Sequence, residues 1–461
     1  MDATIVDEPS AGGAEPEGNV AQVSNLPSEA EPAPEAGGKL ETCSTLDLNE
    51  LQALAPGALD ELCRPFNVRA LQGRTRHHQI LDLIRAALRL NVRISASGFF
   101  DLFGDGFGVL RFPAINFLPV PEDVGVPRAT IQRFRFRPGQ AIAGTLRLPR
   151  DREKTIMLDE VTAIEGMPVA EWQEPTAFDH LTPLHPAGRI ILENTKTDSI
   201  SARAVDLLTP LGRGQRGLIV AAPRVGKTIL LKEIAKAIRV NHPEIVLIIL
   251  LVDERPEEVT DLQREVDCQI YNSTFDENSH RHVQVAELVL ERAKRLVEMK
   301  KDVVVLLDSI TRLARGYNSL QPGKGRTMSG GVESKALLKP KKFFGSARNV
   351  EEGGSLTILA TALVDTGSKM DQVIFEEFKG TGNMELHLDR GLVEKRLYPA
   401  IHVQQSATRR EELLYHPEEW ERVKVLRKAM AALPPIEAME MLIGNLQATK
   451  SNAELLLAGL R

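Results

Sequence analysis

The stretch Gly217-Leu-Ile-Val-Ala-Ala-Pro-Arg-Val-Gly-Lys-Thr228 reads as an apolar strand, a short loop and the start of a helix. In this order, backbone N–H groups and the positive end of a helix dipole can hold phosphate. The pattern matches the phosphate-binding loop G-x-x-x-x-G-K-[ST], except that Ala221 replaces the first glycine. We expect ATP to be contacted by the loop residues Arg224, Val225, Gly226, Lys227, Thr228 and Ile229. Lys227 should neutralise the β- and γ-phosphates, and Thr228 should bind Mg²⁺.

Two further apolar runs end in carboxylates, which phosphoryl transfer also needs. Val303 to Asp308 has the Walker B pattern and predicts that Asp308 lies on the metal side of the site. Ile248 to Val252 is followed by Asp253 and Glu254, and Glu254 is the candidate for polarising water. A single acid at a strand end can equally be a helix cap or a surface charge. Two of them in series after a phosphate loop favour catalysis.

Length and composition indicate a soluble protein of several domains. The chain has 461 residues, of which 43% are apolar and 26% are charged, and it contains no apolar run long enough to cross a bilayer. Its first residues lack the basic start and apolar stretch of a signal peptide, so we expect a cytoplasmic protein without a membrane partner. The three cysteines are too few and too widely spaced to suggest disulfides or zinc. A net charge of −6 excludes a uniformly basic coat for nucleic acid, although local charge can still bind it.

Changes of pattern along the chain predict a multidomain α/β protein. Residues 1–44 are acidic and rich in Ala, Pro and Gly, and are expected to be a disordered tail. Residues 45–92 show helical periodicity and form a small helical module, and residues 93–168 alternate short strand-like runs with turns. A connector at 169–200 leads to an α/β domain with a mostly parallel sheet at 201–461.

Five strand-like runs suggest a small barrel of the oligonucleotide-binding or cold-shock type. They are Gly98 to Phe103, Phe107 to Phe112, Thr130 to Phe136, Ala141 to Leu148 and Thr155 to Ile164.

Four long blocks carry a family resemblance: Asp253-Glu-Arg-Pro-Glu-Glu-Val-Thr260, Asp308-Ser-Ile-Thr-Arg-Leu-Ala-Arg315, Arg348-Asn-Val-Glu-Glu-Gly-Gly354 and Glu376-Glu-Phe-Lys-Gly-Thr-Gly-Asn-Met384. With these blocks, the chain from about residue 46 to its end resembles the Rho family of bacterial transcription termination factors. The resemblance implies a RecA-like P-loop ATPase core that assembles into a homohexameric ring. Such a ring uses ATP to move along nascent RNA from 5′ to 3′ as an RNA–DNA helicase, and it dismantles the RNA polymerase elongation complex.

The resemblance also assigns residues that no local pattern reveals. It implies that Tyr398 stacks on adenine and that Arg255 and Arg312 line the site. It further implies that Arg409 is an arginine finger that enters the neighbouring subunit's site, where a cation at the γ-phosphate would make hydrolysis depend on assembly.

Two segments resemble the loops that grip RNA in the central channel of the ring. They are Gln321 to Gly331, which is rich in Gly and basic residues, and Asp365 to Lys369. Arg326, Thr327 and Lys369 are the expected contacts, because a mobile cation can follow successive phosphates. The alternative is that both segments are mobile surface loops.

The barrel partly fits an RNA-reading signature at Gly106-Phe-Gly-Val-Leu-Arg-Phe112, where aromatic side chains on a strand stack on bases. Phe107 should stack on a base, and Arg111 should contact RNA. At three further positions where the family places stacking aromatics, this sequence has Val109, Gly125 and Thr155. Either the affinity of this RNA site or its pyrimidine preference is therefore expected to be altered, with phosphate contacts from Arg111, Arg133, Arg135 and Arg137 in compensation. The alternative is a barrel that serves mainly as a scaffold.

Two other classes of protein share parts of this pattern. A RecA-like recombinase or a rotary ATP synthase subunit has the same nucleotide-binding core, but the helical module, the barrel and the glycine-rich loop oppose that interpretation. A non-enzymatic RNA-binding factor would leave the phosphate loop as a relic. The joint presence of Lys227, Thr228, Glu254, Asp308 and Arg409 opposes the second alternative.

Overall fold

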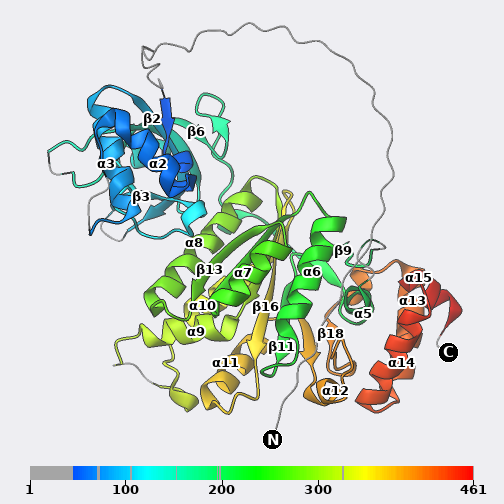
Figure 1. Cartoon of the computed structure of the whole chain (residues 1–461). Coiled ribbons are helices and arrows are strands. Elements are labelled where there is room, and N and C mark those ends of the chain that lie inside the picture. The colour runs from blue at the N-terminus through cyan, green and yellow to red at the C-terminus, as the bar shows by residue number, and fades with distance from the viewer. Residues whose placement is uncertain are drawn as a thin grey trace, which may run out of the picture. The chain divides into compact units, whose positions relative to one another are not determined.

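The computed structural model describes residues 45–69, 73–103, 106–151, 153–194, 196, 199–323 and 327–459 (Figure 1). The expected acidic tail at 1–44 and the expected RNA contact Arg326 lie outside these residues. No helix within the described ranges is long and apolar enough to span a membrane.

The helical module begins with a strand that joins it to the barrel. Strand β1 (Thr45–Asp47) pairs in parallel with β2 of the barrel, and helices α1 (Leu48–Ala53), α2 (Pro56–Cys63) and α3 (Arg76–Arg89) follow. Asp47 caps α1, since its side chain accepts hydrogen bonds from the backbone N–H groups of Asn49 and Glu50. Apolar residues of α1 to α3 share one core with the barrel strands. The module and the barrel are therefore packed as one body.

Five strands form a closed barrel, as the sequence predicts. They are β2 (Arg93–Leu102), β3 (Gly108–Arg111), β4 (Val124–Val126), β5 (Ala141–Arg147) and β6 (Met157–Ile164), with the short β7 (Met167–Pro168) paired to β6. The neighbours run β2-β3-β4-β6-β5, and pairing of β5 with β2 closes the barrel.

One of the five expected strands is wrong. Thr130 to Phe136 was expected to be a strand, but Arg128–Phe134 forms helix α4, with Pro127 in the extended conformation before its first residue. The apolar side chains of Ile131 and Phe134 lie three residues apart and both pack on the barrel core, which suits a helix. The third barrel strand along the chain is instead β4, which has only three residues and a central Gly125, so it produces no alternating pattern in the sequence.

The large domain is built on a sheet with strand order β13-β12-β14-β16-β11-β17-β18. The first six strands of this order are parallel, and β18 is antiparallel to β17. Their bounds are β13 (Gln269–Thr274), β12 (Val246–Glu254), β14 (Asp302–Asp308), β16 (Ser355–Leu363), β11 (Arg216–Ala221), β17 (Met384–Leu388) and β18 (Ala407–Thr408). The sequence prediction of an α/β domain with a mostly parallel sheet is confirmed.

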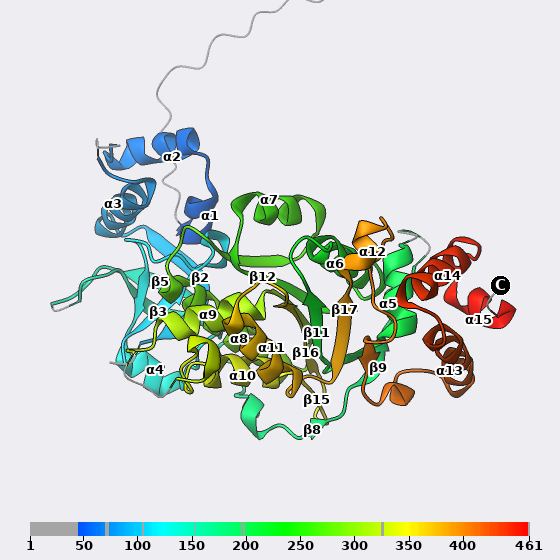
Figure 2. The same cartoon turned by 90° about the horizontal axis from the view of Figure 1, so that it is seen from below.

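Helices cover both faces of this sheet (Figure 2). Helices α6 (Lys227–Asn241) and α7 (Pro256–Glu265) pack on one face with α5 (Ile200–Leu208) and the terminal helices α13 (Pro417–Ala431), α14 (Pro435–Gln447) and α15 (Asn452–Ala458). The other face carries α8 (Ser279–Glu298), α9 (Ile310–Ser319), α10 (Leu338–Gly345) and α11 (Lys369–Lys379). Because the strands are parallel, the carboxyl ends of β11, β12 and β14 lie on the same side of the sheet, and ligands bind there in folds of this kind.

Short elements complete the described chain. They are β8 (Pro183–Leu184), β9 (Ala187–Ile190), β10 (Leu211–Arg213), β15 (Arg348–Val350), α12 (Arg390–Glu394) and the 3₁₀ turns η1 (Arg64–Phe66), η2 (Pro113–Ile115), η3 (Phe178–His180), η4 (Ser329–Gly331) and η5 (Glu411–Leu413).

Helix α8 carries the contact between the barrel and the large domain. Arg137 lies 2.8 Å from Glu298, and Arg292 lies 2.7 Å from Glu165. Gly139 packs directly on the helix, since a Cβ atom there would lie 2.4 Å from the backbone nitrogen of Arg292. A backbone contact this close needs glycine, whose φ is also positive at this position.

Candidate nucleotide and RNA sites

The phosphate loop forms although its first glycine is replaced. Ala221 is the last residue of β11 and is paired on both sides, with Leu363 and Leu388, so it occupies ordinary strand backbone. Gly226 precedes α6 with a φ of 90°, a conformation that favours glycine. Lys227 and Thr228 then open the helix, so their backbone N–H groups face the loop. The substitution at Ala221 therefore leaves the phosphate-binding geometry intact.

Lys227 holds the two expected acids together. Its Nζ atom lies 2.9 Å from Oε1 of Glu254 and 2.5 Å from Oδ1 of Asp308. Burial opposes protonation of Lys227, but attraction by Asp308 and Glu254 outweighs it and the pKa of Lys227 is raised. Burial and the charge of Asp308 raise the pKa of Glu254. The three predicted residues thus form one charged cluster at the carboxyl ends of the parallel strands.

Two further residues fix these acids, and local sequence patterns do not reveal either role. Thr361, on the neighbouring strand β16, donates a hydrogen bond of 2.7 Å to Oδ1 of Asp308. Arg312 on α9 contacts Asp253 at 2.8 Å, and its Nε atom is 3.6 Å from Glu254. A threonine within an apolar run such as Ser355–Leu363 carries no sequence signal beyond ordinary strand propensity.

The side chains around Thr228 suit a magnesium ion that is held partly by a substrate. Thr228 donates to Oε2 of Glu258 at 3.1 Å, and Asp308 lies across Lys227 from Glu254. Within the described residues, no three His, Cys, Asp or Glu side chains form a metal cage. Magnesium at phosphoryl-transfer sites uses one or two protein oxygens together with phosphate and water, so this donor set fits.

Two adjoining cavities collect the other predicted nucleotide contacts. The larger one, of 730 Å³, is lined by Arg224, Gly226, Lys227, Thr228, Ile229 and Arg255, together with the acids Asp253, Glu254 and Glu258. The smaller one, of 160 Å³, is lined by Val225, Gly226 and Ile229 on one side and by Tyr398 on the other. Tyr398 is half-exposed, and its ring lies 4.0 Å from the position a Cβ atom would take on Gly226. The expected aromatic platform is thus beside the phosphate loop.

Arg409 lies near the opposite end of the strands from the phosphate loop, beside the amino end of β17. Its backbone N–H donates to the carbonyl of Asn383, just before β17, whereas Ala221 at the phosphate loop is aligned with Leu388 at the end of β17. Five residues of strand separate these two levels, which corresponds to about 16 Å. The backbone of the exposed Arg409 is therefore about 16 Å along the strand from the level of the phosphate loop of its own chain.

The two segments expected to grip RNA lie against each other. Thr327 forms an isolated bridge with Glu333, and the turn η4 between them packs on the start of α11. A Cβ atom on Gly330 would lie 2.9 Å from the carbonyl of Lys369. Thr327 and Lys369 are both exposed.

An ion pair joins one of these segments to the nucleotide cavity. Arg315 on α9 binds Asp371 on α11 through two nitrogen–oxygen contacts of 2.7 Å each. Thr366, in the second segment, donates to the same carboxylate at 2.6 Å. All three residues line the 730 Å³ cavity. Helix α9 thus carries Arg312, which contacts Asp253 and Glu254, and, one turn later, Arg315, which binds Asp371 beside the second segment expected to grip RNA.

The two RNA contacts expected in the barrel differ in exposure: Phe107 is partly exposed and Arg111 is buried. Phe107 is 37% exposed and stacks on Phe103 with 6.5 Å between ring centroids. Arg111 is only 4% exposed, lies under the ring of Phe103 and binds Asp123 at 2.5 Å. Burial raises the pKa of Asp123 to about 6. Arg111 is therefore part of a buried charged pair and not a freely projecting phosphate contact.

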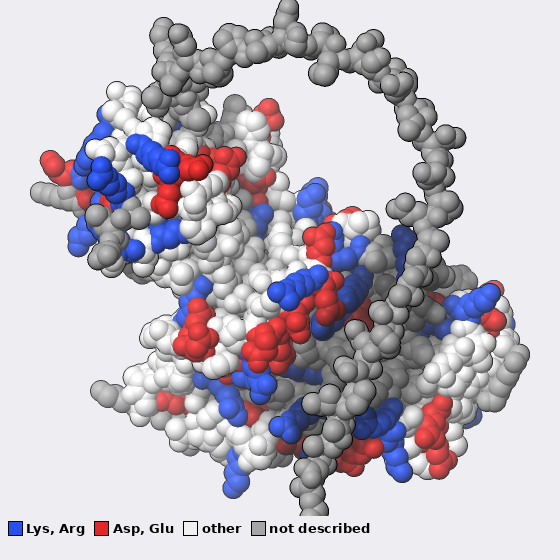
Figure 3. Space-filling view, viewed as in Figure 1, with Lys and Arg blue, Asp and Glu red and all other residues white. Residues whose placement is uncertain are grey.

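The three positions without the expected aromatics are neighbours in space. Val109 on β3 is paired with Gly125 on β4, and a Cβ atom on Gly125 would lie 2.9 Å from the hydroxyl oxygen of Thr155. Of the other arginines expected to compensate, Arg133 and Arg135 are exposed, whereas Arg137 is engaged with Glu298. Over the face seen in Figure 3, basic and acidic side chains are interspersed, so that face carries no uniformly basic coat.

Comparison with known proteins identifies both halves of the chain. The family model for the Rho termination factor RNA-binding domain matches residues 96–170. The model for the nucleotide-binding domain of the ATP synthase alpha/beta family matches residues 201–408.

Sequence relatives match most of the chain. Transcription termination factor Rho of Akkermansia muciniphila is 49% identical over 90% of this chain and 88% of its own length. Its namesake in Chromobacterium violaceum is 48% identical over 88% of this chain and 98% of its own. A solved ATPase of the type III secretion system of pathogenic bacteria has a TM-score of 0.52 at 20% identity, covering 66% of this chain and 93% of its own, which shows a shared fold alone.

Proposed function

This chain belongs to the family of transcription termination factor Rho, and we propose that it acts as a ring of six copies that converts ATP hydrolysis into movement along RNA. The protein is an RNA-binding ATPase of transcription termination, as its family and its two matched domains indicate. The proposal concerns the ring, the helicase activity, the metal and the residues that carry each step.

Hydrolysis is carried by the cluster around Lys227. When ATP enters, its phosphates compete with Glu254 and Asp308 for the ammonium of Lys227. Glu254 then accepts a proton from the water that attacks the γ-phosphorus, while the bond from that phosphorus to the β–γ bridging oxygen breaks and ADP leaves. Thr228 and Asp308 would hold Mg²⁺, which would neutralise charge on the phosphates. Thr361 keeps the Asp308 carboxylate in position.

The placement of Arg409 carries the proposal of a shared active site. Because Arg409 lies at the opposite end of the strands from its own phosphate loop, we propose that it completes the site of another copy. A cation supplied in this way stabilises the charge that develops on the transferred phosphoryl group. Hydrolysis is then possible only after assembly, which suits a homohexamer.

Movement along RNA follows from the link through α9. Loss of the γ-phosphate would change the contacts of Glu254 and Asp253, and so the position of Arg312 on α9. The same helix carries Arg315, which binds Asp371, and Asp371 in turn accepts a hydrogen bond from Thr366. Thr327 and Lys369, together with Arg326, are proposed to hold successive phosphates. The barrel is proposed to capture the nascent transcript through Phe107, while the buried Arg111–Asp123 pair supports the strand that follows it. We place this activity on the elongating RNA polymerase in the cytoplasm, with 5′ to 3′ polarity, as the family implies.

The decisive test compares ATPase activity without nucleic acid, with RNA and with single-stranded DNA. RNA-selective stimulation is the expected result. Equal activity with and without RNA would overturn the proposal and would favour an ATPase that only shares the fold.

A further inference from the structure

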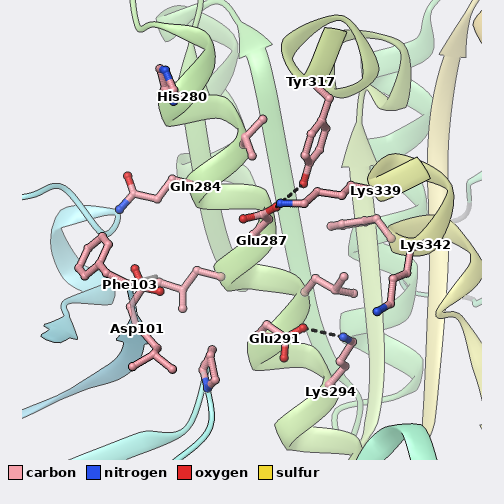
Figure 4. Close-up of a pocket in the computed structure, with 16 residues that line it drawn as sticks. Asp101, Phe103, His280, Gln284, Glu287, Glu291, Lys294, Tyr317, Lys339 and Lys342 are labelled. Carbon is pink, nitrogen blue, oxygen red and sulfur yellow. Dashed lines mark hydrogen bonds and ion pairs between the residues drawn. The ribbon is translucent and has the colours of Figure 1, made fainter. Parts of the chain in front are cut away.

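A second cavity, distinct from the nucleotide site, lies between the barrel and helices α8, α9 and α10 (Figure 4). It has a volume of 540 Å³, and none of its lining residues lines the 730 Å³ nucleotide cavity. Its barrel wall is formed by Asp101, Leu102 and Phe103, at the end of β2, with Pro138. Its opposite wall is formed by α8, by Tyr317 on α9 and by Lys339 and Lys342 on α10.

The walls of this cavity belong to the elements that flank both proposed RNA sites. On the barrel side, Phe103 is stacked on Phe107, the expected base-stacking residue. On the other side, Tyr317 lies near the end of α9, and the segment 321–331 begins directly after that helix. Helix α10 follows the same segment. The lining of the cavity thus comes from elements that adjoin both proposed RNA sites within one chain.

The charges on the lining are matched, with one exception. Glu287 lies 2.6 Å from Lys339 and accepts from the hydroxyl of Tyr317 at 2.9 Å. Glu291 lies 2.6 Å from Lys294. Asp101 lies 3.8 Å from Arg111, a residue that does not line the cavity.

Lys342 is the exception. It is exposed, and it has no ion pair or hydrogen bond with any residue that the structure describes. Its side chain points into the cavity in Figure 4. An anionic group that enters would therefore meet an ammonium that has no competing protein partner.

The same cavity offers apolar surface for a planar ring. Leu102 and Phe103 are adjacent in the sequence, each is 41% exposed, and both line the cavity. Val283 and Phe343 add to the apolar wall, and Gln284 brings an amide to the rim. Stacking of a base on an aromatic side chain contributes about 1 to 3 kcal/mol per base. An aromatic face, a polar edge and one unmatched ammonium are together the groups that recognise a nucleotide.

We propose that this cavity binds one nucleotide of single-stranded RNA as the transcript passes from the barrel to the channel segments. The base packs against Phe103 and Leu102, and a phosphate binds Lys342. The inference rests on the proposed function of the chain as an RNA translocase. It adds a third contact site on the RNA path and assigns Lys342 to it.

Binding of two RNAs to the full-length protein tests the assignment. A short oligonucleotide of about six nucleotides fills the barrel alone, and one several times longer also reaches the cavity. Lys342→Ala should weaken binding of the long RNA roughly fivefold at physiological salt and reduce the slope of log K against log salt by about one, as expected for one lost phosphate contact. Binding of the short RNA should not change, and Lys342→Arg should restore the long RNA.

The neighbouring residue supplies the matched control. Lys341 precedes Lys342 on the same helix, but its ammonium binds Glu377 and it does not line the cavity. Lys341→Ala should therefore leave the affinity for the long RNA unchanged. If Lys342→Ala and Lys341→Ala bind the long RNA equally well, the inference is overturned, and a peptide becomes the better candidate occupant.

Crosslinking gives an independent readout. Long RNA that carries 4-thiouridine should crosslink on irradiation to peptides from α8 or α10, and crosslinks confined to the barrel and the channel segments would contradict the proposal. An equal loss of short and long RNA in Lys342→Ala would likewise overturn it, because the lysine would then serve the barrel. A wild-type protein whose ATPase ignores RNA would instead refute the proposed function, so the two failures are distinguishable.

Discussion

Lys227 and Arg409 lie at opposite ends of the strands of one mostly parallel sheet: Lys227 follows the carboxyl end of β11, and the backbone of Arg409 lies beside the amino end of β17. Lys227 is the cation that meets the phosphates of its own site, and Arg409 is separated from that site by about 16 Å of strand. The proposed mechanism therefore requires two copies of the chain, one that supplies Lys227 and one that supplies Arg409.

Two variants test this division of roles. Lys227→Ala should abolish nucleotide binding, since its ammonium is the main cation of the phosphate site. Arg409→Ala should keep nucleotide binding and assembly but lose turnover by about 10³-fold or more, the usual range for an arginine finger. Fluorescent ATP-analogue binding and steady-state hydrolysis separate the two effects.

A mixture of the two variants sharpens the same test. In a mixed ring, an intact phosphate loop from Arg409→Ala meets an intact arginine from Lys227→Ala, so part of the activity should return. A mixture as inactive as its components, despite exchange of subunits, would speak against a shared site.

The pH dependence of turnover reports on Glu254. Burial and the charge of Asp308 raise its pKa above that of an ordinary glutamate. As a base it must be ionised, so kcat at saturating ATP should fall as pH falls through this raised pKa, at a higher pH than an unperturbed carboxyl would give. Glu254→Gln should lower kcat by about 10² to 10⁴ and remove this limb of the profile. A profile that is unchanged in Glu254→Gln would exclude it as the base.

The ion pair between Arg315 and Asp371 should matter for coupling. Asp371→Asn weakens the link from α9 to the RNA segment, so RNA stimulation of the ATPase should fall several-fold while RNA binding by the barrel stays the same. Glu377→Gln, on the same helix α11, breaks only the pair with Lys341 and serves as the control. Equal loss of stimulation in both variants would indicate general weakening of α11.

Binding of cytidine-rich and mixed-sequence RNA at two salt concentrations tests the barrel. Val109, Gly125 and Thr155 provide no stacking rings at neighbouring positions, and each missing platform is expected to cost about 1 to 3 kcal/mol per base. We expect weak discrimination and a steep salt dependence. Binding that is cytidine-selective, salt-insensitive and dependent on Phe107 would contradict this expectation.

The fold and the ATP site are largely readable from the sequence because their signals are local. A buried strand that ends in an acid, or a loop followed by Lys227 and Thr228, is a continuous pattern. The sequence does not predict strand β4, because three residues with a central glycine carry no periodicity. It predicts a strand where α4 forms, because Ile131, Phe134 and Phe136 also have high strand propensity.

Other features could not be read because they depend on contacts between distant segments. Thr361 contacts Asp308 from a neighbouring strand that is 53 residues away in the sequence, and Asp123 pairs with Arg111 only after the barrel forms. The burial of Arg111 is likewise a property of the closed barrel. The cavity at Lys342 requires the barrel to dock on α8, which no pattern within either segment specifies.

The central claim is that this protein releases transcripts by hydrolysing ATP. The most direct test is transcription of a defined template by RNA polymerase in the presence of the purified protein. The reaction contains either ATP or an analogue whose β–γ bond this protein cannot hydrolyse. Shortened, released transcripts should appear with ATP alone and should be absent with Lys227→Ala. Unchanged full-length transcripts with ATP, or equal release with the analogue, would contradict the account.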